Sequence, residues 1–293
     1  GVINECDTIL KSSTYALQDY SLQEGGALVT KGSREVIFSQ GANNLRYYCG
    51  SGDQLGVDRG VDIELEDDGS YCYMMCAFYG ASDDLMAAFD NEEFFSDQVS
   101  FSDKRCENGF TSGYTLNMET WEEFMIPGVP CKSGEWGLGG VSDCFTLRLA
   151  EVYLNMAEAL AAVGREDEAN RLLLELRKNR LTQQMDMTQH SGEKLIRAIR
   201  AERRLEFNFE GFRWFDLRRY AVNSVCPQKT SITHIWHSGG EGAPVVDSKY
   251  ILGTYGEDAG WVLPIPDDEH RLNENMVENE ERPERKDEYS KKK

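Results

Sequence analysis

Apolar residues recur every three or four positions in several stretches of the chain, and this spacing predicts amphipathic helices. The stretches are residues 2–10, 146–163, 167–179 and 193–209, with a continuation over 212–220. Gly164 is expected to end the second helix and Gly211 to interrupt the fourth, because glycine adopts the backbone conformation that commonly closes a helix. The second and third helices are joined by a short turn, so they are expected to form a helical hairpin similar to one tetratricopeptide unit.

The rest of the chain lacks a sustained period and is rich in Gly, Asn and Asp, which is typical of loops. We therefore predict a mostly α fold with long irregular loops and few short strands. Residues 1–142 would hold the end of a repeat helix and a loop-rich candidate ligand-binding region, and residues 143–277 a helical scaffold. Residues 278–293 are dense in charge and are expected to be disordered. All three parts are expected to form one domain.

Two acidic residues, Glu202 and Glu206, lie one turn apart on the apolar stripe of the fourth predicted helix. A carboxylate among apolar neighbours needs a cationic or hydrogen-bonding partner, because its desolvation is otherwise costly. Arg203, Arg213 and Arg218 are near in sequence, and we expect Arg148 and Arg177 to come from other helices. We predict a structural ion network that includes Arg148, Glu151, Glu202, Arg203, Glu206, Glu210, Arg213 and Asp216.

Paired carboxylates also suggest a general acid and a general base. Each of these glutamates has an arginine within three or four positions, which favours a structural ion pair over a carboxyl group with a raised pKa. The chain contains no motif typical of a serine hydrolase, a P-loop nucleotide-binding protein or a zinc protease. We therefore expect a protein that is not an enzyme.

The segment from Glu202 to Arg219 resembles the signature helix of the SusD/RagB family, E-R-x-x-E-[apolar]-x-x-E-G-x-R-W-x-D-L-x-R. Residues 147–159 resemble the family's R-x-A-E-x-x-L-x-x-A-E-A helix, and Leu263–Pro266 resembles its closing L-P-I-P segment. Weaker similarities are Arg34–Phe38 and Asp103–Arg105. The chain departs from the family at its end, where Glu280 and Glu281 follow Asn279 in place of N-P-G-Y.

The resemblance implies a glycan-binding lipoprotein at the outer-membrane surface. Its expected partners are an oligosaccharide or polysaccharide and a SusC-like TonB-dependent transporter, to which the glycan would be delivered. Family members are longer and begin with helical repeats and a lipidated cysteine, so we expect an N-terminal portion to precede Gly1. Loops determine the ligand, and the sequence leaves open whether it is a glycan, a peptide or a glycopeptide.

The charge of the chain and the spacing of its cysteines and histidines disfavour two other classes of function, nucleic-acid binding and metal binding. The formal net charge of −20 disfavours nucleic acid as a partner, because the chain would repel phosphates. The eight cysteines form no C-x-x-C pair, and His234 and His237 have no acidic ligand nearby, so no metal or other cofactor is expected. The sequence leaves open whether the cysteines are buried thiols or disulfides.

Sugar rings offer an apolar face and a rim of hydroxyl groups, which suit aromatic and amide side chains on loops. The candidate ligand-binding residues are Tyr47, Tyr48, Trp121 and Trp136, with Asn43, Asn44 and Arg46 as polar partners. Trp214 and Trp261 lie in structural segments and are assigned to the core. Two alternatives stay open, a glycoside hydrolase on a helical scaffold and a protein-interaction module that binds no sugar.

Overall fold

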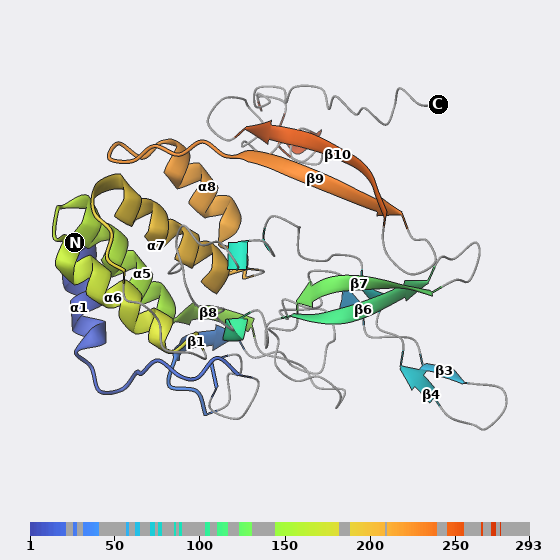
Figure 1. Cartoon of the computed structure of the whole chain (residues 1–293), viewed down its shortest axis with the longest axis horizontal. Helices are drawn as coiled ribbons and strands as arrows, with labels where there is room; N and C mark the ends of the chain where they lie inside the picture. The colour runs from blue at the N-terminus through green and yellow to red at the C-terminus, as the bar shows by residue number, and fades with distance from the viewer. Residues whose placement is uncertain are drawn as a thin grey trace. The chain divides into compact units, whose positions relative to one another are not determined.

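The computed structural model divides the chain into two compact units, Gly1–Gly211 and Phe212–Lys293, each described here by itself (Figure 1). The structure describes residues 1–21, 26–27, 32–40, 57–58, 62–64, 71–73, 76–77, 85, 88–89, 103–105, 110–116, 123–130, 144–181, 188–208, 210–238, 245–254, 265, 271–273 and 276. The domain limits expected from the sequence, after residues 142 and 277, stay a prediction.

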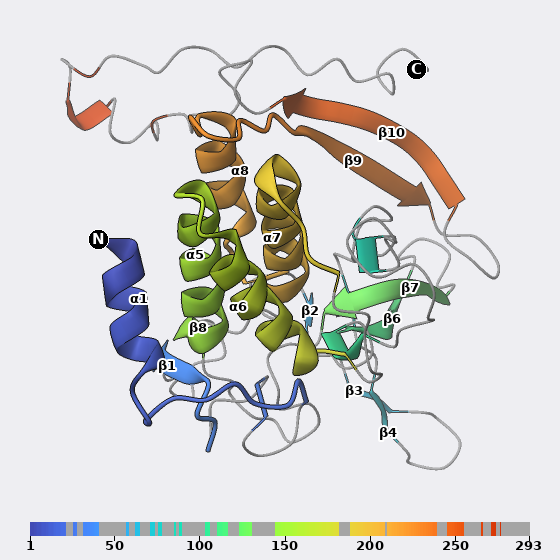
Figure 2. The same ribbon diagram turned by 60° about the vertical axis from the view of Figure 1, so that its left-hand side comes forward.

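Four helices form the scaffold of the first unit: α1 (Val2–Leu10), α5 (Leu149–Ala162), α6 (Glu166–Lys178) and α7 (Gly192–Glu206). Helix α5 contacts the other three, and Figures 1 and 2 show all four side by side. The α5–α6 pair is the helical hairpin predicted from the apolar spacing. The mostly helical fold class predicted from the sequence is thus confirmed.

The core of this scaffold consists of the apolar stripes that face between the helices. Its fully buried side chains include Leu154, Leu160, Leu173, Leu176, Leu195 and Ile199. Burial of each large aliphatic side chain contributes about 1.5–3 kcal/mol, so this layer is the main source of the scaffold's stability. The small residues Ala150 and Ala157 on α5 are completely buried, which is consistent with close approach of the neighbouring helices.

Helix α5 begins later than the sequence predicted. The prediction placed Thr146 to Arg148 in the helix, but these residues belong to strand β8 (Cys144–Arg148). Strand β8 pairs antiparallel with β1 (Val36–Gln40), and Arg148 has an extended backbone, with φ −140° and ψ 159°. The helix therefore starts at Leu149, because backbone pairing with β1 overrides the local apolar period. At its other end, Gly164 has a φ of +79°, as a terminating glycine requires.

Helix α7 ends at Glu206, three residues before the predicted end at Phe209, which lies outside the described residues. Phe207 follows with a non-helical backbone, and Gly211 has a φ of +81°. An L side chain is strained at this φ even though a Cβ atom there would meet no other atom within 4 Å. Gly211 is also the last residue of the first unit.

The strands of the first unit outside β1 and β8 form two small sheets. One has the order β2-β5-β6-β7, from β2 (Val57–Asp58), β5 (Cys76–Ala77), β6 (Phe110–Leu116) and β7 (Glu123–Pro130). The other pairs β3 (Asp62–Glu64) with β4 (Tyr71–Tyr73). The β6–β7 hairpin gives a regular framework to a region whose composition had indicated mainly loops.

The second unit contains α8 (Arg213–Ala221) and a hairpin of β9 (Ser231–Ser238) and β10 (Val245–Thr254). Leu217 and Tyr220 on α8 are buried, whereas Trp214, assigned to the core from the sequence, is half-buried. Trp261 lies outside the described residues. Within the part of the chain that the structure describes, no helix is both long and apolar enough to span a bilayer.

Candidate functional site

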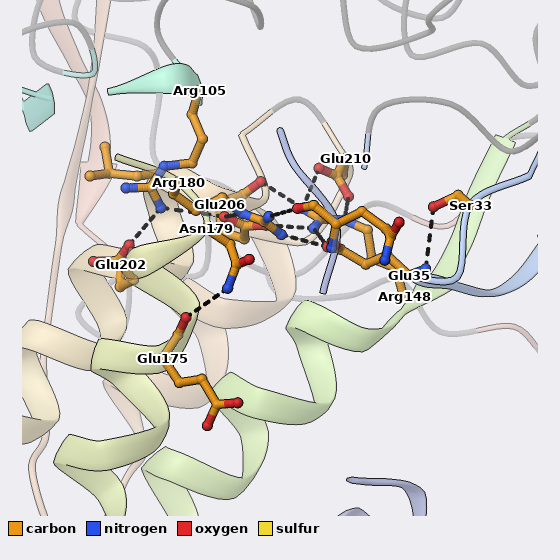
Figure 3. Close-up of polar contacts among 12 residues, drawn as sticks. Ser33, Glu35, Arg105, Arg148, Glu175, Asn179, Arg180, Glu202, Glu206 and Glu210 are labelled. Atoms are coloured by element: carbon orange, nitrogen blue, oxygen red, sulfur yellow. Dashed lines mark hydrogen bonds and ion pairs between the residues drawn. The ribbon is translucent and has the colours of Figure 1, made fainter. Parts of the chain in front are cut away.

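The most highly charged buried feature of the first unit is centred on Glu206, in the last turn of α7. Its carboxylate accepts hydrogen bonds from Nη1 of Arg148 at 2.5 Å, Nη2 of Arg180 at 2.9 Å and Nη1 of Arg105 at 3.3 Å. Figure 3 shows the arginine side chains converging on this carboxylate. Glu206 is completely buried. One carboxylate thus joins three segments that are far apart in sequence.

Glu202 lies one turn earlier on α7 and is also completely buried. It accepts a hydrogen bond from Nη1 of Arg105 on one oxygen and from Nε of Arg177 on the other, both at 2.6 Å. Arg177 lies in the last turn of α6, so this carboxylate links α6 to α7. Arg105 also donates to Asp103, through Nη2 at 2.7 Å and Nε at 3.0 Å.

Arg148, the last residue of β8, completes the arrangement. It donates to Glu210 through Nε and Nη2, both at 2.8 Å, and to Glu35 through Nη1 at 3.0 Å. Its guanidinium also lies 4.4 Å from the centroid of the Phe207 ring, a favourable cation–π distance. We call this set the arginine–carboxylate cluster: Glu35, Asp103, Arg105, Arg148, Arg177, Arg180, Glu202, Glu206 and Glu210.

Burial and charge act in opposite directions on the two central carboxylates. Burial raises the pKa of Glu206, but Arg180, Arg148 and Arg105 outweigh this effect and hold its pKa well below the ordinary value. Burial likewise raises the pKa of Glu202, but the attraction of Arg105 and Arg177 is stronger, so the pKa of Glu202 lies below its ordinary value. Both side chains therefore stay ionised at neutral pH.

The cluster's chemistry is that of a structural clamp. A general acid needs a pKa raised towards the working pH and a path to its substrate, and Glu202 and Glu206 have neither. Each oxygen of the two carboxylates accepts a hydrogen bond from an arginine, and this attraction offsets the cost of burying the charge. In the described part of the chain, no group of three or more His, Cys, Asp or Glu residues is arranged to hold a metal ion.

The structure distributes the predicted network residues over three places. Arg148, Glu202, Glu206 and Glu210 meet in the cluster. Arg203 and Glu151 instead form a separate α7–α5 contact at 3.6 Å, supported by a 2.9 Å hydrogen bond from Arg203 to Asn155. The last two, Arg213 and Asp216, belong to the second unit, where Asp216 pairs with Arg219 at 2.9 Å.

Four members of the cluster were missed by the sequence prediction: Glu35, Asp103, Arg105 and Arg180. Asp103 enters the cluster through Arg105, two positions away. Glu35, Arg105 and Arg180 have partners that are distant in sequence, for example 101 positions between Arg105 and Glu206 and 145 between Arg180 and Glu35. Local spacing carries no information about such pairs. The family resemblance did mark the segments Arg34–Phe38 and Asp103–Arg105, and their charged residues were the available signal.

The candidate ligand-binding residues lie outside the described residues. They are Asn43, Asn44, Arg46, Tyr47, Tyr48, Trp121 and Trp136. In chain order Trp121 falls between β6 and β7, and Trp136 falls between β7 and β8. His234 and His237 lie on β9.

One protein-family model matches this chain. The family model described as the SusD family matches residues 68–281, which is more than half of the chain. No curated protein sequence matches the chain.

Solved structures share the fold. A SusD superfamily protein from Bacteroides thetaiotaomicron is 19% identical with a TM-score of 0.57, and the match covers 95% of this chain and 56% of that one. A SusD-like carbohydrate binding protein from Bacteroides vulgatus is 17% identical with a TM-score of 0.54, covering 94% and 54%. The surface glycan-binding protein A from Bacteroides uniformis is 18% identical with a TM-score of 0.54, covering 94% and 55%. The chain thus spans about half the length of these proteins.

Proposed function

This chain belongs to the SusD family, and on that premise we propose that it binds a glycan at the cell surface without catalysing a reaction. The bound glycan would be delivered to a SusC-like TonB-dependent transporter in the outer membrane. The observation that carries the proposal is the family match over residues 68–281, which spans both the region with Trp121 and Trp136 and the helical scaffold.

The similar structures support the ligand class. Two of those with a TM-score above 0.5 are described as a carbohydrate binding protein and a surface glycan-binding protein. At 17% and 18% identity they share the fold, and the loops that would select a particular glycan are free to differ. The proposal therefore names a ligand class and leaves the individual sugar to experiment.

The arginine–carboxylate cluster supports the non-enzymatic part of the proposal. The closely spaced carboxylate pair that first suggests glycoside hydrolysis consists of Glu202 and Glu206. Both are buried and ionised, and both are bound by arginines. A glycosidase needs one carboxyl group that is protonated at working pH and can reach the glycosidic oxygen. This pair is unsuited to that reaction.

We propose that the binding surface is formed by Tyr47, Tyr48, Trp121 and Trp136, with polar contacts from Asn43, Asn44 and Arg46. Aromatic rings stack on the C–H face of a sugar, and amide and guanidinium groups bond to its hydroxyls. The net charge of −20 favours neutral glycans over strongly anionic ones, because like charges repel.

Affinity electrophoresis on a panel of neutral polysaccharides tests the proposal directly. We expect at least one polysaccharide to retard the protein in a dose-dependent manner, with no release of reducing ends on prolonged incubation. Release of reducing ends would favour the hydrolase alternative. Retardation by none of the panel would favour a protein-interaction module, which pull-down with the transporter would then test.

Substitution of the candidate aromatics locates the surface. Trp121→Ala or Trp136→Ala is expected to weaken binding at least tenfold while leaving the melting temperature nearly unchanged. Phe215→Ala is a matched control, because Phe215 is an exposed aromatic residue of the second unit that is not a candidate. Unchanged affinity in both tryptophan variants would remove these residues from the proposed surface.

A further inference from the structure

We propose that Arg105 is a positioning residue that fixes the loop-rich region of residues 41–142 to the helical scaffold, and that ligand affinity depends on this attachment. The part that concerns affinity rests on the proposed function. The part that concerns attachment rests only on contacts of the first unit. Arg105 would act through the segments that flank it in the chain and would not touch the ligand itself.

The first argument is the number and burial of the contacts that Arg105 makes. Its side chain is completely inaccessible to solvent, and it binds three carboxylates, those of Asp103, Glu202 and Glu206. Coulombic attraction to these groups outweighs the opposing effect of burial and raises the pKa of Arg105 well above its ordinary value. A guanidinium held in this way is fixed in both position and orientation.

The backbone beside Arg105 is held as well. Asp103 forms an antiparallel bridge with Leu181, just after α6, and the amide of Lys104 donates to the carbonyl of Arg180 at 2.8 Å. The ammonium of Lys104 also pairs with the carboxylate of Asp19. Residues 103–105 are therefore docked on the scaffold by main-chain and side-chain contacts together.

The second argument is where the cluster's members lie along the chain. Glu35 immediately precedes β1, before the loop-rich region begins, and Arg148 ends β8, after it finishes. Both bind through the cluster, since Arg148 donates to Glu35 and to Glu206. Arg105 reaches Glu206 from within the region. Glu206 thus binds Arg148, just after the region, and Arg105, inside it. Glu35, just before the region, binds Arg148 and so belongs to the same cluster.

The third argument is the short distance along the chain from Arg105 to regular structure. Strand β6 begins at Phe110, and five residues of extended chain span at most about 17 Å. The strand pairs with both β5 and β7, so its placement also sets theirs. Trp121 lies in the chain between β6 and β7. Loss of the contacts at Arg105 would therefore release the strands on either side of a candidate ligand residue.

Arg177 provides a matched control. Like Arg105, it donates to Glu202 at 2.6 Å from a nearly completely buried side chain. The two arginines occupy the two oxygens of the same carboxylate. Arg177 belongs to α6, however, and its bond to Glu202 joins two scaffold helices. Replacing either residue disturbs the same buried charge, and only replacement of Arg105 removes side-chain contacts that attach residues 103–105 to the scaffold.

The experiment compares Arg105→Lys with Arg177→Lys by amide hydrogen exchange. In Arg105→Lys we expect exchange in β6 and β7 to accelerate at least tenfold, while α5 stays within twofold of the wild type. In Arg177→Lys we expect β6 and β7 to stay within twofold, with any acceleration confined to α6 and α7. Equal acceleration of β6 in the two variants, or none in Arg105→Lys, would overturn the proposal.

Affinity for a polysaccharide that retards the wild type supplies a second measurement. We expect Kd to rise at least tenfold in Arg105→Lys and to stay within twofold in Arg177→Lys, although both variants melt at a lower temperature. Equal losses of affinity would overturn the positioning role. Should Arg105→Lys fail to fold, Asp103→Asn replaces it, because that change weakens the same attachment without removing the guanidinium, and the same outcomes apply.

The two measurements separate this inference from the proposed function. If no polysaccharide retards the wild type, the proposed function fails, and hydrogen exchange still decides whether Arg105 attaches the strands. If the wild type binds and Arg105→Lys binds equally well, the inference fails and the proposed function stands.

Discussion

The charged segment from Glu202 to Arg219 has two halves whose side chains lie in different environments. Between Glu202 and Glu210, the acidic side chains are buried against arginines from other parts of the first unit. Between Arg213 and Arg219, in the second unit, Asp216 pairs with Arg219, which lies three positions away and has 40% of its side chain exposed. The Asp216–Arg219 pair spans three positions, whereas the pairs of Glu202 and Glu206 with Arg105 span 97 and 101 positions.

The difference teaches that charge density alone does not identify a buried cluster. A pair formed within one helical turn needs no tertiary structure and contributes little when water competes for it. The contacts of one carboxylate with three arginines from distant segments form only when the whole unit has folded. They therefore contribute to the free energy of unfolding of the unit as a whole. Substitutions in the two halves should therefore differ widely in their effects.

The largest effect is expected for Glu206→Ala. Removal of this carboxylate leaves Arg105, Arg148 and Arg180 buried with too little negative charge, which should cost about 3–5 kcal/mol of the free energy of unfolding. Urea denaturation followed by circular dichroism measures the loss, and Glu206→Gln, which keeps the shape, should lose less. A cost below about 1 kcal/mol would contradict the clamp role.

Lowering the pH should produce the next largest loss of stability, and this loss should arise from the first half of the segment, at Glu202 and Glu206. The pKa values of Glu202 and Glu206 are lowered in the folded protein, so the stabilisation is present above the unfolded glutamate value of about 4.3 and is lost as the pH falls through the folded values. Urea midpoints measured from pH 7 to pH 3 should fall on the acid side, and less steeply in Glu206→Gln. Parallel curves for the two proteins would contradict this assignment.

A smaller effect is expected for Glu210→Ala. Glu210 binds Arg148 through two hydrogen bonds of 2.8 Å, but Arg148 keeps Glu35 and Glu206 when it is lost. Loss of hydrogen bonds to a charged group that retains other partners should cost about 1.5–3 kcal/mol. The same urea titration measures the cost. A loss of stability as large as that of Glu206→Ala would contradict the view that Glu206 is the centre of the cluster.

The smallest effect is expected for Arg219→Ala in the second half. Its pair with Asp216 is local and partly exposed, so the free energy of unfolding should change by at most about 1 kcal/mol. Differential scanning calorimetry should show a shift of only a few degrees, and raising the salt concentration should reduce it further. A shift comparable with that of Glu210→Ala would end the distinction between the two halves.

The sequence was sufficient for features that depend on neighbouring residues. The apolar period located helices α1 and α5 to α8 of the described residues, and the positive φ values of Gly164 and Gly211 match the breaks predicted there. Glu202 and Glu206 were identified as buried because they share a stripe with Leu195 and Ile199, which are completely buried too.

Some features that depend on tertiary partners escaped prediction, although the contacts of Arg148 and Arg177 with these glutamates were expected. Arg203 is adjacent to Glu202 in sequence, but one residue turns the side chain by about 100° around a helix, so it contacts Asn155 and Glu151 on α5 instead. Arg105 and Arg180 occupy the place that nearby arginines were expected to fill. Strand pairing also set the start of α5, since Arg148 lies opposite Val36 of β1.

The meeting of Glu35, Arg105 and Arg148 in one cluster has a consequence for how the protein tolerates insertions. The stretches of chain between these three residues each start and finish at a side chain that is held in the cluster. Doubling the length of a closed stretch costs only about 0.6 kcal/mol of closure entropy. Insertions in these stretches are therefore expected to cost the folded protein little free energy of unfolding.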